Sequence, residues 1–259
     1  QPEDRNDGGG INKESFRISD YLSLAKDIFK NLNPATDIYF SQGPMDVLDH
    51  SCSKLGFGGK MCIDGTPKYA EEVDDSYQLP VAGYQLDEEL LISKFSGIKA
   101  VNVALLKKDI PCLIVSVQKN RKGHIKELHE QICGVKEIET VKIILYVEHT
   151  VDAHDLPTAL WRFCNNLDPK RDHYLHKRPT HDSRLTTPDS YFACMGFDGT
   201  RKTKEFDDFH RDWPNIIVAD DETIKVVNEK WNSLGIGEFI PSPSLKFKDQ
   251  MYGEEAVVE

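Results

Sequence analysis

An internal repeat is the feature that most constrains the fold of this 259-residue chain. Residues 19–40 align without a gap with residues 154–175, and residues 61–68 align in the same order with residues 195–202. Identical pairs in the longer alignment are Asp20/Asp155, Asn31/Asn166, Leu32/Leu167, Pro34/Pro169 and Asp37/Asp172. Because one short gap reconciles the two alignments, we expect two copies of one structural unit.

Each copy has the pattern of a helix followed by a short strand. Apolar residues recur at helical spacing, which gives each helix one apolar face. They are Leu22, Ala25, Phe29 and Leu32 in the first copy and Leu156, Leu160, Phe163 and Leu167 in the second. A proline then ends each helix, because the residue before a proline is disfavoured in helical geometry. Strands at 37–41 and 172–176 follow, and a long loop leads to a shared Met-x-x-Asp-Gly-Thr-x-Lys motif.

Only the second copy carries the elements of a complete domain. The predicted strands are 99–106, 110–117, 141–148 and 215–219, and the predicted helices are 122–134 and 220–235. Near-continuous apolar strands that alternate with helices are typical of an α/β layered sheet with helices on both faces. We therefore expect an α/β fold made of one complete and one partial copy of the same unit.

The repeat divides the chain into four parts. They are a disordered segment or linker (1–15), the partial copy with its acidic connector (16–87), the complete α/β domain (88–241) and a loose tail (242–259). A helix, a strand and a loop cannot bury an apolar face alone. The partial copy must therefore pack on the complete copy, on another chain or on a preceding part of a longer protein, which the first residue, Gln, also indicates.

The glycine-rich stretch 54–68 does not match a nucleotide-binding loop. A phosphate-binding loop requires Ser or Thr after its Gly-Lys pair, whereas methionine follows here, and no strand leads a G-x-G-x-x-G pattern into a helix. Asp64 can instead accept hydrogen bonds from the backbone amides that follow it, and Gly65 allows turn geometry. Asp198 and Gly199 occupy the same places in the second copy, so both segments are first interpreted as tight turns.

Charge and hydropathy exclude several classes of function. The net charge is -11 and the carboxylates are spread along the sequence, which argues against nucleic acid because phosphate recognition needs clustered Lys and Arg. No apolar run approaches the roughly 20 residues of a membrane span, and no secretory leader is visible. We expect a cytoplasmic protein without a transmembrane segment.

The cysteines and histidines suggest no metal site. The six cysteines, at 52, 62, 112, 133, 164 and 194, form no short-spaced pair and are typical of reduced thiols in a cytoplasm. Zinc sites need ligand pairs at short spacing. Only His173 with His176, and His149 with His154, offer one, and such pairs arise by chance among nine histidines.

The region 43–68 resembles the C-terminal signature of the UbiD-type carboxy-lyases, which include 3-octaprenyl-4-hydroxybenzoate decarboxylase. The residues that fit are Pro44, Asp46, Leu48, Asp49, Lys60, Met61, Asp64, Thr66 and Lys68, whereas Cys62 and Gly65 depart from the usual glycine and alanine. The second copy resembles the strand-helix-strand-helix order of the family's C-terminal domain. It keeps Gly196 but has Cys194 in place of a lysine.

The resemblance implies decarboxylation of aromatic or α,β-unsaturated acids with prenylated FMN and a metal ion, in ubiquinone or menaquinone biosynthesis. The duplication suggests the longer decarboxylases associated with menaquinone synthesis. The family's cofactor, metal ligands and Glu-Arg-Glu catalytic set belong to an N-terminal domain. We therefore expect this chain to contain no catalytic residue, bind no cofactor or metal and be inactive alone. Its expected partners are that N-terminal domain and further copies of itself.

By the same resemblance, one loop is the candidate surface facing the cofactor domain. Its residues are Asp46, Asp49, Lys60, Asp64, Thr66 and Lys68, and the repeat counterparts are Asp198, Gly199, Thr200 and Lys202.

Two other functions stay open. The chain could be a stand-alone interaction module whose complete copy dimerises and whose partial copy completes a partner's sheet. A hydrolase built on His149, Asp152, His154 and Asp155 has less support, because no nucleophile lies at motif spacing.

Overall fold

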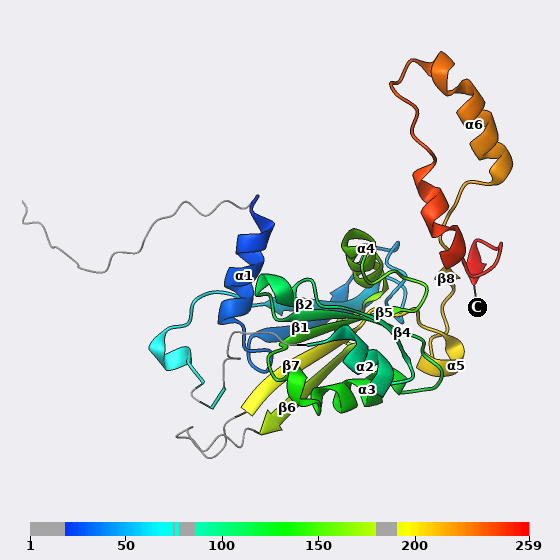
Figure 1. Cartoon of the computed structure of the whole chain (residues 1–259). Coiled ribbons are helices and arrows are strands. Elements are labelled where there is room, and N and C mark those ends of the chain that lie inside the picture. The colour runs from blue at the N-terminus through cyan, green and yellow to red at the C-terminus, as the bar shows by residue number, and fades with distance from the viewer. Residues whose placement is uncertain (1–18, 75, 78–85, 180–190, 259) are drawn as a thin grey trace, which may run out of the picture.

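A five-stranded mixed sheet forms the centre of the fold (Figure 1). The computed structural model describes residues 19–74, 76–77, 86–179 and 191–258, so the expected linker 1–15 lies outside the described residues. The strand order is β3-β4-β5-β7-β6, with β4, β5 and β7 parallel and the two edge strands antiparallel to their neighbours. The strands are β3 (Ile98–Asn102), β4 (Cys112–Val117), β5 (Ile143–Glu148), β6 (His173–Pro179) and β7 (Tyr191–Asp198).

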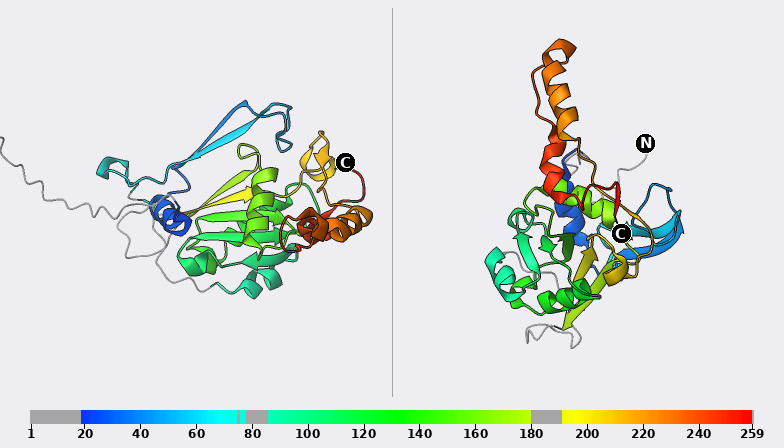
Figure 2. Two further views of the ribbon diagram at one scale, coloured as in Figure 1. Left: turned by 90° about the horizontal axis from the view of Figure 1, so that it is seen from above. Right: turned by 90° about the vertical axis from the view of Figure 1, so that its right-hand side faces the viewer.

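Helices cover both faces of this sheet, as predicted (Figures 1 and 2). They are α1 (Tyr21–Asn31), α2 (Glu88–Lys94), α3 (His124–Cys133) and α4 (Leu156–Asn166). On one face, Leu91 of α2 and Ile132 of α3 join a buried apolar cluster with side chains of β4 and β5. On the other face, Leu32 after α1 and Phe163 of α4 join a second cluster. Every residue of β4 and β5 is buried, as parallel strands covered on both sides should be.

The two copies of the repeat fold alike, which confirms the predicted duplication. In each copy a helix leads into an antiparallel hairpin: α1 into β1 and β2, and α4 into β6 and β7. The strands of the first hairpin are β1 (Ile38–Pro44) and β2 (Phe57–Ile63). Asp20 caps α1 by accepting from the backbone N–H of Ser23, and Asp155 caps α4 in the same way through Thr158.

The first hairpin lacks one neighbour that the second hairpin has. β7 lies between β6 and β5, whereas β2 pairs only with β1 within the described part of the chain. The apolar side of the first copy packs on the second copy, because Leu32 and Ile38 lie in the same buried cluster as Ile143 and Leu145 of β5. Three packing partners were possible from the sequence: the complete copy, another chain or a preceding part of a longer protein. The complete copy is the one that packs on this face.

Lys142, directly before β5, ties α1 to the sheet. Its Nζ donates to the carbonyl oxygens of Phe29 at 2.6 Å and Leu32 at 2.7 Å, at the C-terminal end of α1. Burial lowers the pKa of the Lys142 ammonium to about 8, although Asp37 opposes this shift. The positive charge complements the helix dipole at this end.

Replacing Lys142 with methionine is expected to loosen α1 while the sheet stays folded. Two hydrogen bonds from a charged donor, each contributing about 1.5–3 kcal/mol, are lost, and two carbonyl groups lose their partner. Hydrogen–deuterium exchange should therefore accelerate in α1 and stay unchanged in β4 and β5. Lys26→Met is the control, because Lys26 lies on the same helix but pairs with Asp109 at the surface. Equal acceleration in both variants would contradict the assignment.

The residues after β7 form an arm that extends from the sheet (Figures 1 and 2). α5 (Lys204–Asp207) still lies beside the sheet, and the arm consists of β8 (Trp213–Pro214), α6 (Asp221–Leu234), η4 (Pro243–Gln250) and β9 (Val257–Val258). α6 matches the predicted helix but buries none of its residues. The strand predicted at 215–219 is wrong: the chain forms β8 instead, and the side chain of Asn215 donates to the carbonyls of Gly253 and Glu255. The segment expected to be a loose tail contains η4 and β9, and β9 pairs with β8.

Short 3-10 turns complete the connections between these elements. They are η1 (Ala70–Glu72), η2 (Leu106–Lys108) and η3 (Lys136–Ile138). Among the described residues, no helix combines the length and the apolar character that crossing a membrane requires.

Candidate functional site

The Asp-Gly-Thr segment of the first copy forms a turn closed by a lysine. Oδ1 of Asp64 accepts hydrogen bonds from the backbone N–H of Thr66 at 2.9 Å and from its hydroxyl at 2.6 Å. Nζ of Lys68 donates to Oδ2 of Asp64 at 2.7 Å and lies 3.5 Å from Oδ2 of Asp37. The hydrogen bonds from Lys68 and Thr66 hold the pKa of Asp64 well below its usual range. The turn predicted from the sequence is present, with a lysine bound across it.

The second copy repeats the hydrogen bonds between Asp and Thr with the same atoms, and its lysine binds mainly backbone carbonyls. Oδ1 of Asp198 accepts from the N–H of Thr200 at 2.9 Å and from its hydroxyl at 2.5 Å. Nζ of Lys202 donates to the carbonyls of Asp198 and Thr200 and lies 3.6 Å from Oδ2 of Asp172. Gly199 packs closely, because a Cβ atom there would lie 2.5 Å from Cδ2 of Phe163 on α4. An alanine would not fit this position without a shift.

The two turns differ in burial. The side chains of Lys202 and Asp198 are 1% and 3% exposed, whereas those of Lys68 and Asp64 are 16% and 38% exposed. Burial alone would raise the pKa of Asp198, but Lys202 and Lys119 outweigh it and hold the pKa below its usual value. The second turn is therefore part of a buried ionic network, and the first lies at the surface.

This buried network gathers at the carboxyl ends of the three parallel strands. Lys119 follows β4, and its Nζ donates to the hydroxyl of Thr200 and to both carboxylate oxygens of Asp207. Glu148 ends β5 and pairs with Arg162 of α4. The sequence analysis missed Lys119, Glu148 and Arg162. A signal was available, because polar residues at the carboxyl ends of adjacent parallel strands meet at one edge of the sheet.

The other predicted site residues do not join the first turn. Asp46 and Asp49 lie in the loop at the far end of the β1–β2 hairpin, where they accept hydrogen bonds from the backbone N–H groups of Leu48 and Ser51. Seven residue steps separate Phe57, at this end of β2, from Asp64, or roughly 23 Å. Lys60 lies between them, exposed on β2. The predicted set is therefore spread along one hairpin rather than gathered at one point.

The glycines of the stretch 54–68 allow close packing between the two copies. A Cβ atom at Gly59 would lie 2.0 Å from Oδ1 of Asp168 and 2.6 Å from the backbone nitrogen of Lys170. One at Gly58 would lie 2.7 Å from Cβ of Cys52 in the first copy and 3.5 Å from Oδ2 of Asp168 in the second. β2 therefore passes directly over the loop that follows α4, where no side chain fits.

Comparison with known families agrees with this fold. Residues 11–65 and 84–199 match the model of the 3-octaprenyl-4-hydroxybenzoate carboxy-lyase C-terminal domain, which is more than half of the chain. The chain belongs to this family. The resemblance found in the sequence is thereby confirmed.

Relatives of this carboxy-lyase C-terminal region are longer proteins. An uncharacterized protein of Helicobacter pylori J99 is 27% identical over 226 residues, which cover 85% of this chain and 32% of the relative. An uncharacterized protein of Aeropyrum pernix is 26% identical over 175 residues, which cover 62% and 36%. The chain thus spans about a third of the length of the curated relatives it matches.

Two solved structures are among those that match part of this chain. The closed form of vanillic acid decarboxylase from Sedimentibacter hydroxybenzoicus is 17% identical, with a TM-score of 0.42 over 58% of this chain and 31% of that one. An evolved dimeric form of the UbiD-class enzyme HmfF from Pelotomaculum thermopropionicum, in complex with prFMN, is 16% identical, with a TM-score of 0.36 over 52% and 26%.

A hollow of about 590 Å³ between α4 and the C-terminal arm does not fit the flavin expected for a carboxy-lyase. A flavin phosphate needs unpaired cations or free N–H donors that converge on one point. The two cations that line the hollow are already bound, Arg162 to Glu148 and Lys246 to Asp155. We therefore assign no flavin-dependent step to these residues.

Proposed function

We propose that this chain is the C-terminal region of a prenylated-FMN-dependent decarboxylase that acts on an aromatic carboxylate in quinone biosynthesis. Membership of the carboxy-lyase family and the greater length of the relatives support this proposal. In it, the cofactor and a metal ion are held by an N-terminal domain, and prenylated FMN supplies the decarboxylation chemistry there. The present chain mediates oligomer contacts, closes over the active site and is inactive alone.

The open edge of β2 is the observation that carries the proposal. In the complete copy the equivalent strand, β7, pairs in parallel with β5 from Ile143 to Tyr146. β2 has no such neighbour in the described part of the chain, although its copy repeats the helix and both hairpin strands of the unit. An unpaired strand edge is a ready site for strand addition. We infer that a strand of the preceding domain occupies this edge, as β5 does in the complete copy.

Apolar side chains at the surface of the β1–β2 hairpin support the same contact. The exposed fractions are 58% for Tyr39, 68% for Val47, 84% for Leu48, 64% for Leu55, 42% for Phe57 and 42% for Ile63. Several large apolar side chains gathered on one element mark an interaction surface more often than an ordinary solvated face. We call these six residues the hairpin surface, and we propose that the N-terminal domain covers it.

Turnover by the separate and combined parts tests this function. The purified chain with prenylated FMN is expected to release no CO₂ from an aromatic acid. The same chain co-expressed with the preceding domain is expected to be active, as measured by CO₂ release. Turnover by the chain alone, or equal turnover of the preceding domain with and without it, would refute the proposal.

Lys60→Ala in the intact enzyme tests the role of the hairpin. Lys60 is exposed on β2 and extends across the hairpin beside Gly43. If it orients the cofactor domain, its loss should lower kcat/KM by about tenfold through misplacement of the reacting groups. Lys99→Ala is the matched control, because Lys99 is also an exposed strand lysine but lies on edge strand β3. An unchanged rate for Lys60→Ala would leave the loop with a structural role only.

A stand-alone dimerisation module is the second candidate. The same open edge of β2 favours it, because two copies could pair their edges. In that case, the chain is dimeric in the absence of any other domain and the hairpin surface is protected from hydrogen exchange. A monomeric mass in light scattering across the accessible concentration range would exclude this alternative and leave the first.

A further inference from the structure

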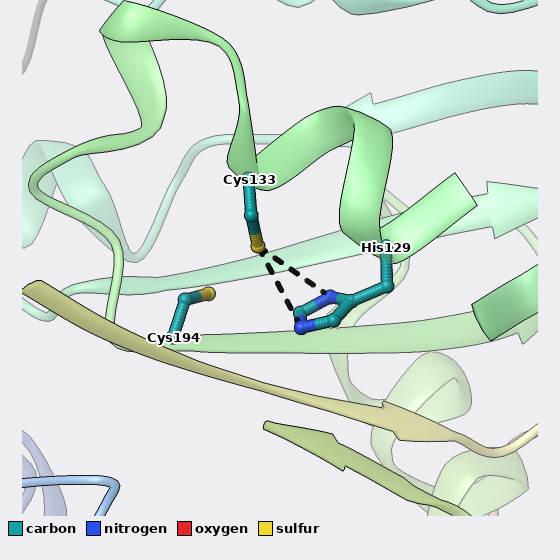
Figure 3. A group of neighbouring side chains, drawn as sticks. All are labelled: His129, Cys133 and Cys194. Carbon is teal, nitrogen blue, oxygen red and sulfur yellow. Dashed lines mark hydrogen bonds between the residues drawn. The ribbon is translucent and has the colours of Figure 1, made fainter. Parts of the chain in front are cut away.

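Three potential metal ligands meet beneath α3, outside the sites described above (Figure 3). His129 and Cys133 lie one helical turn apart on α3, and Cys194 points toward them from β7. Their residues are 1%, 4% and 7% exposed. Their ligand atoms all lie within 4.8 Å of one another. One imidazole and two thiols therefore converge in the buried interior between α3 and the sheet.

The ring of His129 is held in the orientation that a metal ligand needs. Its Nδ1 lies 2.9 Å from the phenol oxygen of Tyr146, a buried residue on β5. When Nδ1 donates to that oxygen, the lone pair of Nε2 is free, and Nε2 lies 3.6 Å from Sγ of Cys133. Zinc–sulfur and zinc–nitrogen bonds of about 2.3 and 2.0 Å at a tetrahedral angle place the two ligand atoms about 3.5 Å apart. Tyr146 thus acts as the outer partner that ligating histidines usually have.

Gly196 provides the space for this ring. It lies two residues from Cys194 on β7, so both face α3. A Cβ atom at Gly196 would lie 2.6 Å from Nδ1 of His129. No side chain fits there while the imidazole occupies its place above the strand. The same glycine that fits the family's motif therefore accommodates the histidine.

A small cavity beside the two sulfurs is also bordered by the imidazole of His176, which lies outside the group of ligand atoms within 4.8 Å of one another. It measures about 10 Å³ and is bordered by Cys133, Cys194 and His176, a volume close to that of a single water-sized probe. His176 lies on β6 as the cross-strand partner of Cys194, so the two side chains share one face. Glu139 also borders the cavity but is bound to Arg178 at 3.0 Å.

We propose that His129, Cys133, Cys194 and His176 bind one Zn²⁺ ion. Two Cys and two His ligands are a common set for closed, four-coordinate structural zinc. The charges also balance, since two thiolates and two neutral imidazoles cancel the charge of the ion. Burying such a neutral site is less costly than burying an isolated charge. The ion would pin α3 to β6 and β7.

Metal content and cobalt spectra test the site in the whole chain. After expression with added zinc and dialysis, the chain is expected to retain one zinc ion per molecule, as measured by elemental mass spectrometry. After zinc removal, added Co²⁺ is expected to give the visible bands of tetrahedral cobalt and a thiolate-to-cobalt charge-transfer band. Tyr146→Phe should weaken Co²⁺ binding by about 10–100-fold, the usual cost of losing an outer partner.

Cysteine variants separate this site from ordinary core thiols. Cys133→Ser and Cys194→Ser should lose the bound zinc, and Cys112→Ser is the control, because Cys112 is equally buried on β4 but lies outside the cluster. Should the serine variants misfold, the cobalt spectrum of the unmodified chain still decides. A chain that binds no stoichiometric zinc and shows no thiolate-to-cobalt band, or one whose Cys133 and Cys194 form a disulfide, overturns the proposal.

Discussion

Replacing Lys202 with methionine lowers the free energy of unfolding by about 3–5 kcal/mol, the usual loss when one partner of a buried ion pair is removed. Lys202 is 1% exposed and faces the carboxylates of Asp198 and Asp172, which are each 3% exposed. Without the ammonium, each of these buried carboxylates loses one of its cations, although Asp172 keeps Arg171 at 2.6 Å and Asp198 keeps the more distant charge of Lys119. For a chain of this length, we expect the Tm to fall by on the order of 10 °C, measured by thermal unfolding.

The first copy supplies the matched control for this change. Lys68 occupies the equivalent place and binds Asp64, but both side chains reach solvent. Exposed ion pairs contribute little because water and salt screen them. Lys68→Met is therefore expected to change the Tm several times less than Lys202→Met. Equal losses would mean that burial does not distinguish the two turns.

The loss of stability in Lys202→Met is also expected to depend on pH. The folded pKa of Asp198 lies below its unfolded value, because Lys202 and Lys119 outweigh the effect of burial. Its contribution is therefore fully present above the unfolded pKa of about 3.9 and is lost as the pH falls through the lower folded value. Once the carboxylates are protonated, the counter-ion is no longer needed. The difference in stability between wild type and Lys202→Met should thus shrink below about pH 4.

The duplicated unit could be predicted because its signals are local. Helix caps at Asp20 and Asp155, prolines after each helix and the Asp-Gly-Thr turns all act within a few residues, and each copy carries them independently. The end of β3 could not be predicted in this way. Apolar residues continue to Leu106, but Asn102 donates to the carbonyl of Ala153 and accepts from the N–H of Ala104, which turns the chain out of the sheet. Such a stop depends on a loop 51 residues away.

The arm after β7 was also predicted only where its signals are local. The helix at 221–234 has local signals, namely Asp220 as its N-cap and Gly235 with a left-handed φ of 62° after its end. The strand expected at 215–219 was wrong because its apolar run has no neighbour on the sheet. Its first residue, Asn215, is bound instead by the backbone of residues 253–256.

The candidate site was harder to predict than the fold, because it depends on contacts between the copies. Asp46 and Lys60 were grouped with Asp64 by motif order, yet the hairpin separates them in space. Lys119 and Glu148 were overlooked, although Lys119 lies two residues after the apolar strand β4 and Glu148 ends the apolar strand β5.

The His129–Cys133 pair was overlooked for a different reason. Its spacing of one helical turn places both side chains on one face of α3, but the prediction rested on pairs of two histidines or two cysteines, and this pair is mixed. The third member, Cys194, is 61 residues further along the chain, and only the fold brings it into contact. No local pattern of the sequence contains all three.

Gly59→Ala is expected to separate the β1–β2 hairpin from the complete copy. The new Cβ atom would lie 2.6 Å from the backbone nitrogen of Lys170 and 2.0 Å from Oδ1 of Asp168. Backbone cannot move aside as a flexible side chain does, so the strand must shift away. Overpacking of this kind costs about 1–3 kcal/mol. We expect faster hydrogen exchange in β1 and β2, with β4, β5 and β7 unchanged, and a fall in turnover of the intact enzyme.

Gly43→Ala is the control, because Gly43 lies on β1 of the same hairpin and a Cβ atom there meets only the end of the Lys60 side chain, at 3.2 Å. A lysine end can move aside at little cost, so this variant should keep the exchange pattern of wild type. If both alanine variants are neutral, the hairpin does not lie against the loop after α4. A different outcome is that Gly59→Ala changes hydrogen exchange in the hairpin but does not change the turnover of the full-length enzyme. In that case the docking of the hairpin is only structural, and the proposal that it positions the cofactor domain fails.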